Sequence, residues 1–99
     1  MQVRPGTRLR SQVSEAEFVV IRGQFEEPEL RAGGLPLIGT DGTADPAGGD
    51  PSGEVQIGKR YSDAGGQIEI LCVKGGSGAL TWGEEALTVK AAKALPSSD

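Results

Sequence analysis

Short apolar runs broken by turn-forming residues constrain this sequence more than any other feature. The chain of 99 residues contains 16 glycines and 6 prolines, which favour many turns and few long helices. One short apolar run is EFVVIR at 17–22, which combines β-branched and aromatic residues. It is too short for a helix and suits a strand buried on much of both faces. The pattern therefore predicts an all-β protein.

Further strands are expected on both sides of a long polar segment. LRAGGLPLIG, from residue 30, predicts a second extended piece with a Gly-Gly turn inside it. In EVQIGKRY, Val55 and Ile57 alternate with polar residues as they do in a strand. In QIEILCVK, the alternation places three apolar residues on one side of a strand: Ile68, Ile70 and Cys72.

The end of the sequence continues this alternation of strands and turns. GGSG at 75–78 is expected to be a turn, ALTW a strand, GEE a second turn and ALTVK a closing strand. This order is typical of a β-meander. Only AAKAL, near the C-terminus, has helical propensity, and Pro96 ends it.

The length predicts one small domain covering residues 1–99. We expect a first unit at about 9–38, a flexible linker at 39–53, a second unit at about 54–91 and a short tail at 92–99. The linker contains no large apolar side chain whose burial could offset the entropy lost on ordering it.

A repeated frame links the two units. LRAGGLPL at 30–37 and LTWGEEAL at 80–87 both have a leucine, a glycine three residues later and a leucine seven residues later. Coincidence in a glycine-rich sequence and duplication of a β unit are both open. A unit of about 30 residues could not bury a hydrophobic face alone. We therefore expect two short β-meander units that share one core and are related by a pseudo-two-fold axis.

Net charge, hydropathy and cysteine content indicate which partners and which cellular compartment suit the chain. A net charge of −4 argues against nucleic-acid binding, which needs clustered Lys and Arg. No apolar run approaches the roughly 18 residues that span a bilayer, and the N-terminus lacks a hydrophobic signal core. One cysteine, Cys72, excludes an intrachain disulfide and fits a reducing compartment. We expect a cytoplasmic protein that contacts neither nucleic acid nor membrane.

The second unit resembles the desulforedoxin family and the similar N-terminal domain of desulfoferrodoxins. The resemblance rests on Tyr61, Gly66, the strand ending at Lys74, the GGSG turn, and the closing Leu80 and Leu87. The first unit resembles the closing part of that pattern through LRAGGLPL. The whole sequence is also similar to small actinobacterial proteins, from which no activity can be carried over. The resemblance implies a small β fold, and a duplicated chain would imitate the dimer that the family forms from two chains.

Members of this family bind iron or zinc through four thiolates. Here Asp63 stands in place of the first cysteine, Gly65 or Gly66 in place of the second, and Trp82 and Gly83 in place of the other pair. In the first unit Ala32 and Gly33 occupy the matching places. We therefore expect no metal and no other cofactor.

Three other candidate sites are weak. GEVQIGK at 53–59 has the spacing of a phosphate-binding loop, but Arg60 replaces the Ser or Thr that would bind magnesium. The aspartates of 41–50 depart from calcium-loop spacing and are expected to be solvated. Cys72 lies between Leu71 and Val73 with no histidine in the chain, so a buried, inert thiol is expected.

These exclusions predict a protein that is not an enzyme. The leading hypothesis is a metal-free β module that binds another protein or a second copy of itself. The expected contact is an exposed strand edge near residues 74–84, with four candidate residues: Trp82, Lys74, Glu84 and Glu85. Trp82 is either a cap over the core or an exposed anchor for a partner. The alternative is a small-molecule-binding accessory protein for a metabolic enzyme, holding an apolar ligand between the units.

Overall fold

The computed structural model describes residues 2–26 and 29–89, and these residues form an all-β fold. The predicted fold class is confirmed. In the first half, the described residues 2–26 and 29–39 contain seven strands: β1 (Gln2–Val3), β2 (Arg8–Arg10), β3 (Glu17–Arg22), β4 (Phe25–Glu26), β5 (Leu30–Ala32), β6 (Leu35–Pro36) and β7 (Ile38–Gly39). The second half, residues 54–89, contains seven more: β8 (Glu54–Val55), β9 (Arg60–Ser62), β10 (Glu69–Lys74), β11 (Gly76–Ser77), β12 (Leu80–Trp82), β13 (Glu85–Ala86) and β14 (Thr88–Val89).

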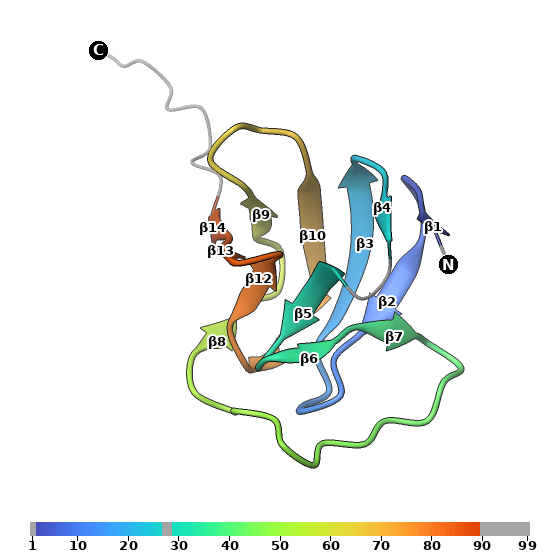
Figure 1. Cartoon of the computed structure of the whole chain (residues 1–99), viewed down its shortest axis with the longest axis vertical. Helices are drawn as coiled ribbons and strands as arrows, with labels where there is room; N and C mark the ends of the chain where they lie inside the picture. The colour runs from blue at the N-terminus through green and yellow to red at the C-terminus, as the bar shows by residue number, and fades with distance from the viewer. Residues whose placement is uncertain (1, 27–28, 90–99) are drawn as a thin grey trace.

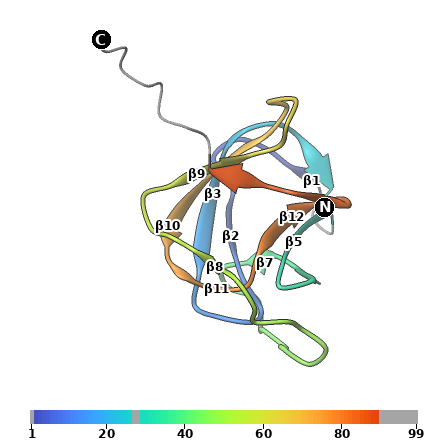
Figure 2. The same cartoon turned by 90° about the vertical axis from the view of Figure 1, so that its left-hand side faces the viewer.

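The strands form two main sheets and two short ribbons. A six-stranded sheet has the order β14-β9-β10-β3-β2-β7, and a four-stranded sheet has the order β13-β12-β5-β6. β1 pairs with β4, and β8 pairs with β11. In the side view, β3 and β10 lie on one side of the molecule, and β5 and β12 lie on the other (Figure 2). The core fills the space between these two layers.

Equivalent strands of the two halves pair with each other at the centre of both sheets. β3 is antiparallel to β10, with Val20 opposite Ile70 and Phe18 opposite Cys72. β5 and β12, which are also equivalent strands of the two halves, pair with each other in the same antiparallel way. The outer pairings also correspond. In the first half β2 pairs with β3 and β7, and in the second half the equivalent strand β9 pairs with β10 and β14. The two halves are therefore related by a pseudo-two-fold axis.

One hydrophobic core serves both halves. Alternation in β3 and β10 turns Phe18, Val20, Ile70 and Cys72 inward, and each is at most 1% exposed. The remaining core side chains come from nearly every strand: Val3, Leu9, Phe25, Leu30, Leu37, Val55, Tyr61, Ile68, Leu80 and Leu87 among them. The shared core predicted from the repeat is present.

Four details of the strand predictions differ from the structure. β3 is buried on one face only, because the other face of its sheet is solvated and Ile21 is 38% exposed. GGSG at 75–78 is not a simple turn: Gly76 and Ser77 form β11, which pairs with β8. Ile57 is 67% exposed, since β8 ends at Val55. Strands of one half pair with strands of the other, so the order departs from a simple meander.

A further feature that the strand pattern did not predict is the burial of Glu69, which is 5% exposed. Its carboxylate forms an ion pair with Arg60 at 3.1 Å between Nη1 and Oε2. This pairing offsets part of the cost of burying the charge.

The segment expected to be a linker runs along the lower edge of the molecule between β7 and β8 (Figure 1). Most of its side chains are exposed, as expected, but its backbone is attached to the first half. The Asp50 amide donates to the Gly33 carbonyl at 2.8 Å, and the Asp45 amide donates to Gln12 Oε1 at 3.1 Å. The predicted AAKAL helix and the tail lie outside the described residues.

Candidate functional site

Trp82, the last residue of β12, is partly exposed and packs against the core. Its ring lies 6.3 Å from that of Phe25, with the planes tilted by 59°, a geometry typical of favourable aromatic pairs. Phe25 is itself 5% exposed. Trp82 thus caps the core on one side and leaves part of its surface available on the other, combining the two roles considered from the sequence.

The turn after Trp82 brings a residue of the first half into the same region. Gly83 has a φ of +63°, which lets β12 reverse into β13 within two residues. Its amide donates to the Glu29 carbonyl at 2.8 Å. This hydrogen bond joins the two halves and places Glu29 beside Trp82.

Trp82 lies in a shallow depression of about 480 Å³ that is open to solvent. We call it the Trp82 depression, and five residues line it: Glu29, Trp82, Gly83, Glu84 and Glu85. A neighbouring depression shares Glu29, Gly83 and Glu84 and adds Arg31 and Gly34. The predicted Trp82, Glu84 and Glu85 are therefore brought together at one surface.

Backbone amides orient two of the three carboxylates. Glu85 Oε2 accepts a hydrogen bond from the Ala64 amide at 2.6 Å, and Glu29 Oε1 accepts one from the Glu26 amide at 3.2 Å. Glu84 is exposed at the tip of the turn. The arrangement offers negative charge at fixed positions around an aromatic ring.

The structure places Lys74, the remaining predicted site residue, elsewhere. It ends β10, where it is exposed and lies opposite Glu17 of β3. It does not line the Trp82 depression. Glu29 does line that depression, but sequence reasoning missed it because it reaches Trp82 only through the pairing of β5 with β12.

The positions that match the family's metal ligands have other roles in the second half. Asp63 is buried, and its Oδ1 accepts a hydrogen bond from the Ile68 amide at 2.9 Å. Trp82 packs against Phe25. Among residues 2–26 and 29–89, no group of three or more His, Cys, Asp or Glu side chains is placed to hold a metal ion.

In the first half, Ala32 and Gly33 are buried at the matching positions. The side chain of Val13 lies against Gly33, because a Cβ added to this glycine would be 2.8 Å from Val13 Cγ2. An apolar side chain therefore lies beside Gly33.

Cys72 is buried at 1% exposure, and its thiol donates to the Lys74 carbonyl at 3.3 Å. Burial raises the pKa of the Cys72 thiol, and a backbone hydrogen bond with Lys74 lowers it only in part. A thiol in this state is a poor nucleophile, because the thiolate is the reactive form. The predicted burial of Cys72 is confirmed.

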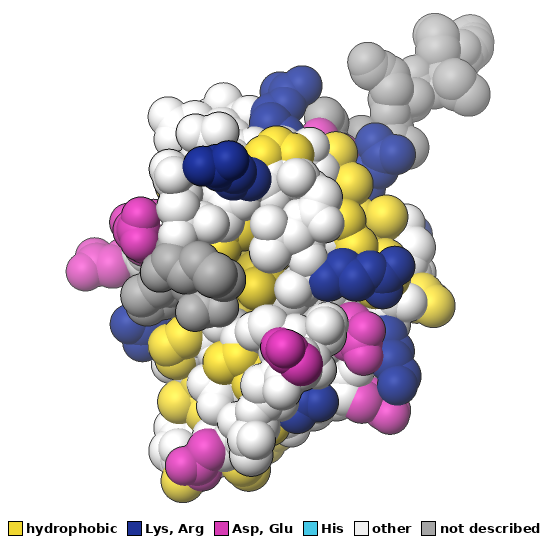
Figure 3. All heavy atoms as spheres, turned by 90° about the vertical axis from the view of Figure 1, so that its right-hand side faces the viewer, with side chains coloured by type: hydrophobic (Ala, Val, Ile, Leu, Met, Phe, Trp, Pro, Cys, Tyr) yellow, Lys and Arg dark blue, Asp and Glu magenta, His cyan; other side chains and the backbone are white. Residues whose placement is uncertain are grey.

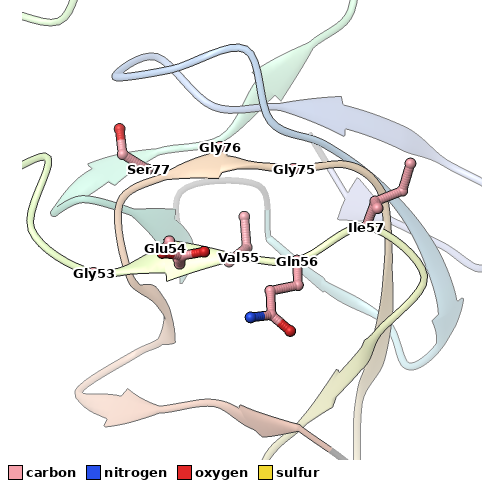
Figure 4. A pocket seen from close by; sticks show the side chains of 8 residues that line it. All are labelled: Gly53, Glu54, Val55, Gln56, Ile57, Gly75, Gly76 and Ser77. Carbon is pink, nitrogen blue, oxygen red and sulfur yellow. The ribbon is translucent and has the colours of Figure 1, made fainter.

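A further depression, of about 530 Å³, lies along β8 and β11. Figure 4 shows Val55 and Gln56 on opposite sides of this ribbon. Its lining includes three glycines, one carboxylate, that of Glu54, and the exposed Ile57. This lining offers few groups that could bind a ligand specifically.

The charged side chains do not gather by sign on the face drawn in Figure 3. Lys and Arg alternate there with Asp and Glu, and hydrophobic side chains lie between them (Figure 3). Within the part of the chain that the structure describes, there is also no helix of the length and apolar character needed to cross a membrane.

Comparison with known proteins gave no match: no family model, no curated protein and no solved structure is significantly similar to this chain.

Proposed function

We propose that this protein is a non-catalytic, metal-free β module that binds another protein or a second copy of itself, as an accessory subunit. One observation carries the proposal: Trp82 is held from one side by Phe25 while part of its surface lines an open depression. A tryptophan held in this way supplies a large contact area at little cost in conformational entropy. The Trp82 depression is the proposed contact surface.

The chemistry of the side chains supports a protein that is not an enzyme. The sequence contains no histidine, and its one thiol is buried with a raised pKa. The carboxylates of Glu29 and Glu85 are engaged by backbone amides instead of by a second titratable side chain. A general acid–base pair needs two such groups within reach of one substrate.

We also infer that the two halves arose by duplication of one desulforedoxin-like unit that lost its metal ligands. The reciprocal pairings of β3 with β10 and of β5 with β12 support this inference. They are the contacts that two identical chains would make across a two-fold axis. A cytoplasmic location is proposed as well, because the single cysteine is free and buried.

A small-molecule-binding accessory protein is the second candidate. The partly exposed indole of Trp82 could form one wall of a site for a flat apolar ligand. A site between the halves has less support, because Phe18, Val20, Ile70 and Cys72 fill that region. The two candidates differ in what co-purifies with the protein.

Affinity purification from source cells, followed by mass spectrometry of proteins and small molecules, tests the proposal. The full chain is compared with Trp82→Ala and with Ile57→Ala, which removes an exposed apolar side chain on the β8 side. We expect a protein partner, or a dimer detected by sedimentation, that is retained by the full chain and by Ile57→Ala but is weakened in Trp82→Ala. Circular dichroism confirms that both variants fold.

Undiminished binding by folded Trp82→Ala would reject the proposed surface. A stoichiometric small molecule, with no protein partner and no dimer, would favour the second candidate instead.

A further inference from the structure

The pseudo-two-fold relation makes two turns equivalent, and the chain itself covers one of them. Gly33, after β5, matches Gly83, after β12: both have a φ of +63°, and both amides donate to a carbonyl of the other half. The Gly33 carbonyl also accepts a hydrogen bond from the Asp50 amide at 2.8 Å. Gly33 is consequently buried, whereas Gly83 is exposed.

The covering segment, residues 46–50, packs tightly on the first turn. A Cβ added to Gly49 would lie 2.3 Å from Val13 Cγ1 and 3.0 Å from Leu35 Cδ1. A Cβ added to Gly33 would lie 2.6 Å from the Asp50 carbonyl oxygen. The segment itself turns here, because the Gly49 amide donates to the Pro46 carbonyl at 2.9 Å. A short segment of chain therefore fits against a turn of this shape.

The second turn has no such cover among the described residues. A Cβ added to Gly83 would meet no atom within 4 Å, and Glu84 and Glu85 are exposed. We propose that this open turn docks a short basic segment of a partner protein, placed over Gly83 much as residues 46–50 lie over Gly33. This inference rests on the proposed function and specifies the chemistry of the partner.

The charge of the partner follows from the residues around the turn. Three carboxylates, those of Glu29, Glu84 and Glu85, line the Trp82 depression. Arg31 is the one cation lining the adjoining depression, and its Nη1 donates to the Gly34 carbonyl at 3.3 Å. Negative charge thus exceeds positive charge at this surface, and a basic segment is complementary to it.

An arginine suits the combination of indole and carboxylates. A guanidinium group can stack on the indole face of Trp82 and donate hydrogen bonds to a neighbouring carboxylate through its planar edge. In the first half the equivalent positions are Ala32 for Trp82 and Leu35 for Glu85, so the covered turn lacks this chemistry. The recognition of a cation is therefore a property of the open turn alone.

A synthetic peptide tests the inference directly. The probe is acetyl-Gly-Gly-Arg-Gly-Arg-Gly-Gly-amide, and the control replaces both arginines with citrulline, which keeps the shape and removes the charge. Trp82 is the only tryptophan, so its fluorescence reports binding at the site, and amide chemical shifts locate the peptide. We expect saturable, salt-sensitive binding that is about tenfold weaker for the citrulline peptide.

Charge variants separate specific recognition from general attraction to an acidic protein. The double variant Glu29→Gln with Glu84→Gln should bind the arginine peptide several-fold more weakly. The matched control Glu54→Gln removes an exposed carboxylate lining the β8–β11 depression and should bind as the unaltered chain does. Trp82→Ala, which lacks the fluorescence reporter, is followed by chemical shifts and should lose the binding.

Three outcomes would overturn the inference: no saturable binding at millimolar peptide, equal binding of the citrulline peptide, or unchanged binding by the Glu29→Gln, Glu84→Gln protein. A co-purifying protein partner or dimer that requires Trp82 but tolerates the two glutamines would overturn the basic-segment inference and leave the proposed function standing. A partner or dimer that tolerates Trp82→Ala would overturn both.

Discussion

Val20 of β3 lies directly opposite Ile70 of β10, and both side chains are buried at the centre of the six-stranded sheet. The pair joins residues fifty positions apart in the sequence. Phe18 and Cys72 repeat the contact on the other side of the pseudo-two-fold axis. The core is therefore formed between the halves, and neither half contains a complete core of its own.

Leu30→Ala and Leu80→Ala should each destabilise the whole molecule. Leu30 is fully buried and Leu80 is 3% exposed, so each truncation should lower the free energy of unfolding by about 2–5 kcal/mol. Chemical denaturation followed by the amide signals of each half separately should give one coincident transition for each variant. Separate transitions for the two halves would contradict a shared core.

Gly33→Ala and Gly83→Ala form a matched pair, because both glycines have a φ of +63°. Gly83→Ala should cost about 1–2 kcal/mol from backbone strain alone. Gly33→Ala should cost more, because its Cβ would collide with the Asp50 carbonyl and displace the segment that covers it.

Hydrogen exchange measures this difference. The Asp50 amide, which donates to Gly33, should be protected in the unaltered protein and exposed in Gly33→Ala, while Gly83→Ala leaves it protected. Equal effects of the two substitutions on stability and on Asp50 exchange would mean that the first turn is not covered in solution.

Stability should fall at alkaline pH through Cys72. In the unfolded chain the thiol titrates near its ordinary pKa of 9.0, whereas burial raises its pKa in the folded state. The stability contributed by the neutral thiol is fully present below pH 9 and is lost as the pH rises through the folded pKa. Denaturation curves between pH 7 and 10.5 should show a steeper decline for the unaltered chain than for Cys72→Val. Parallel declines would contradict a thiol with a raised pKa.

Elemental analysis should find no stoichiometric metal in protein purified without a chelator. The positions that match the family's ligands hold Asp63, whose Oδ1 accepts the Ile68 amide, and Trp82, which packs on Phe25. The expected result is a zinc and iron content far below one ion per chain, because the thiolate ligands of such a site are missing. One metal ion per chain would show that another ligand set forms.

Local patterns were sufficient to predict much of the fold. Alternation in QIEILCVK correctly placed Ile68, Ile70 and Cys72 in the core, and EFVVIR is β3. These predictions succeeded because a period of two directly records which face of a strand is buried. The Gly-Gly turn between β5 and β6 was equally local.

The remaining features depend on contacts between distant segments. GGSG reads as a turn, yet Gly76 and Ser77 pair with β8, more than twenty residues earlier in the chain.

The correspondence of the halves was partly hidden as well, because β1–β3 match β8–β10 at an offset of 52 and β5–β7 match β12–β14 at an offset of 50. A single offset of fifty aligns only the second group.

In the candidate site too, neighbours in the sequence were predicted, whereas residues brought in by contacts between distant segments were not. Trp82, Glu84 and Glu85 were predicted together because they are adjacent in the sequence. Glu29 joins them through the pairing of β5 with β12 and the adjoining hydrogen bond from the Gly83 amide to the Glu29 carbonyl. The cover over Gly33 was not foreseen because residues 46–50 contain no large apolar side chain and bind through their backbone.

The central claim is that the two halves are held together by the core between them and not by the chain that connects them. A protease site inserted after Gly42, in the exposed segment between β7 and β8, allows the folded protein to be cut into two pieces. Sedimentation and thermal unfolding of the cut protein test the claim. We predict one particle of unchanged mass that unfolds in a single transition at a lower, concentration-dependent temperature. Two separate particles, or halves that unfold at independent temperatures, would contradict the claim.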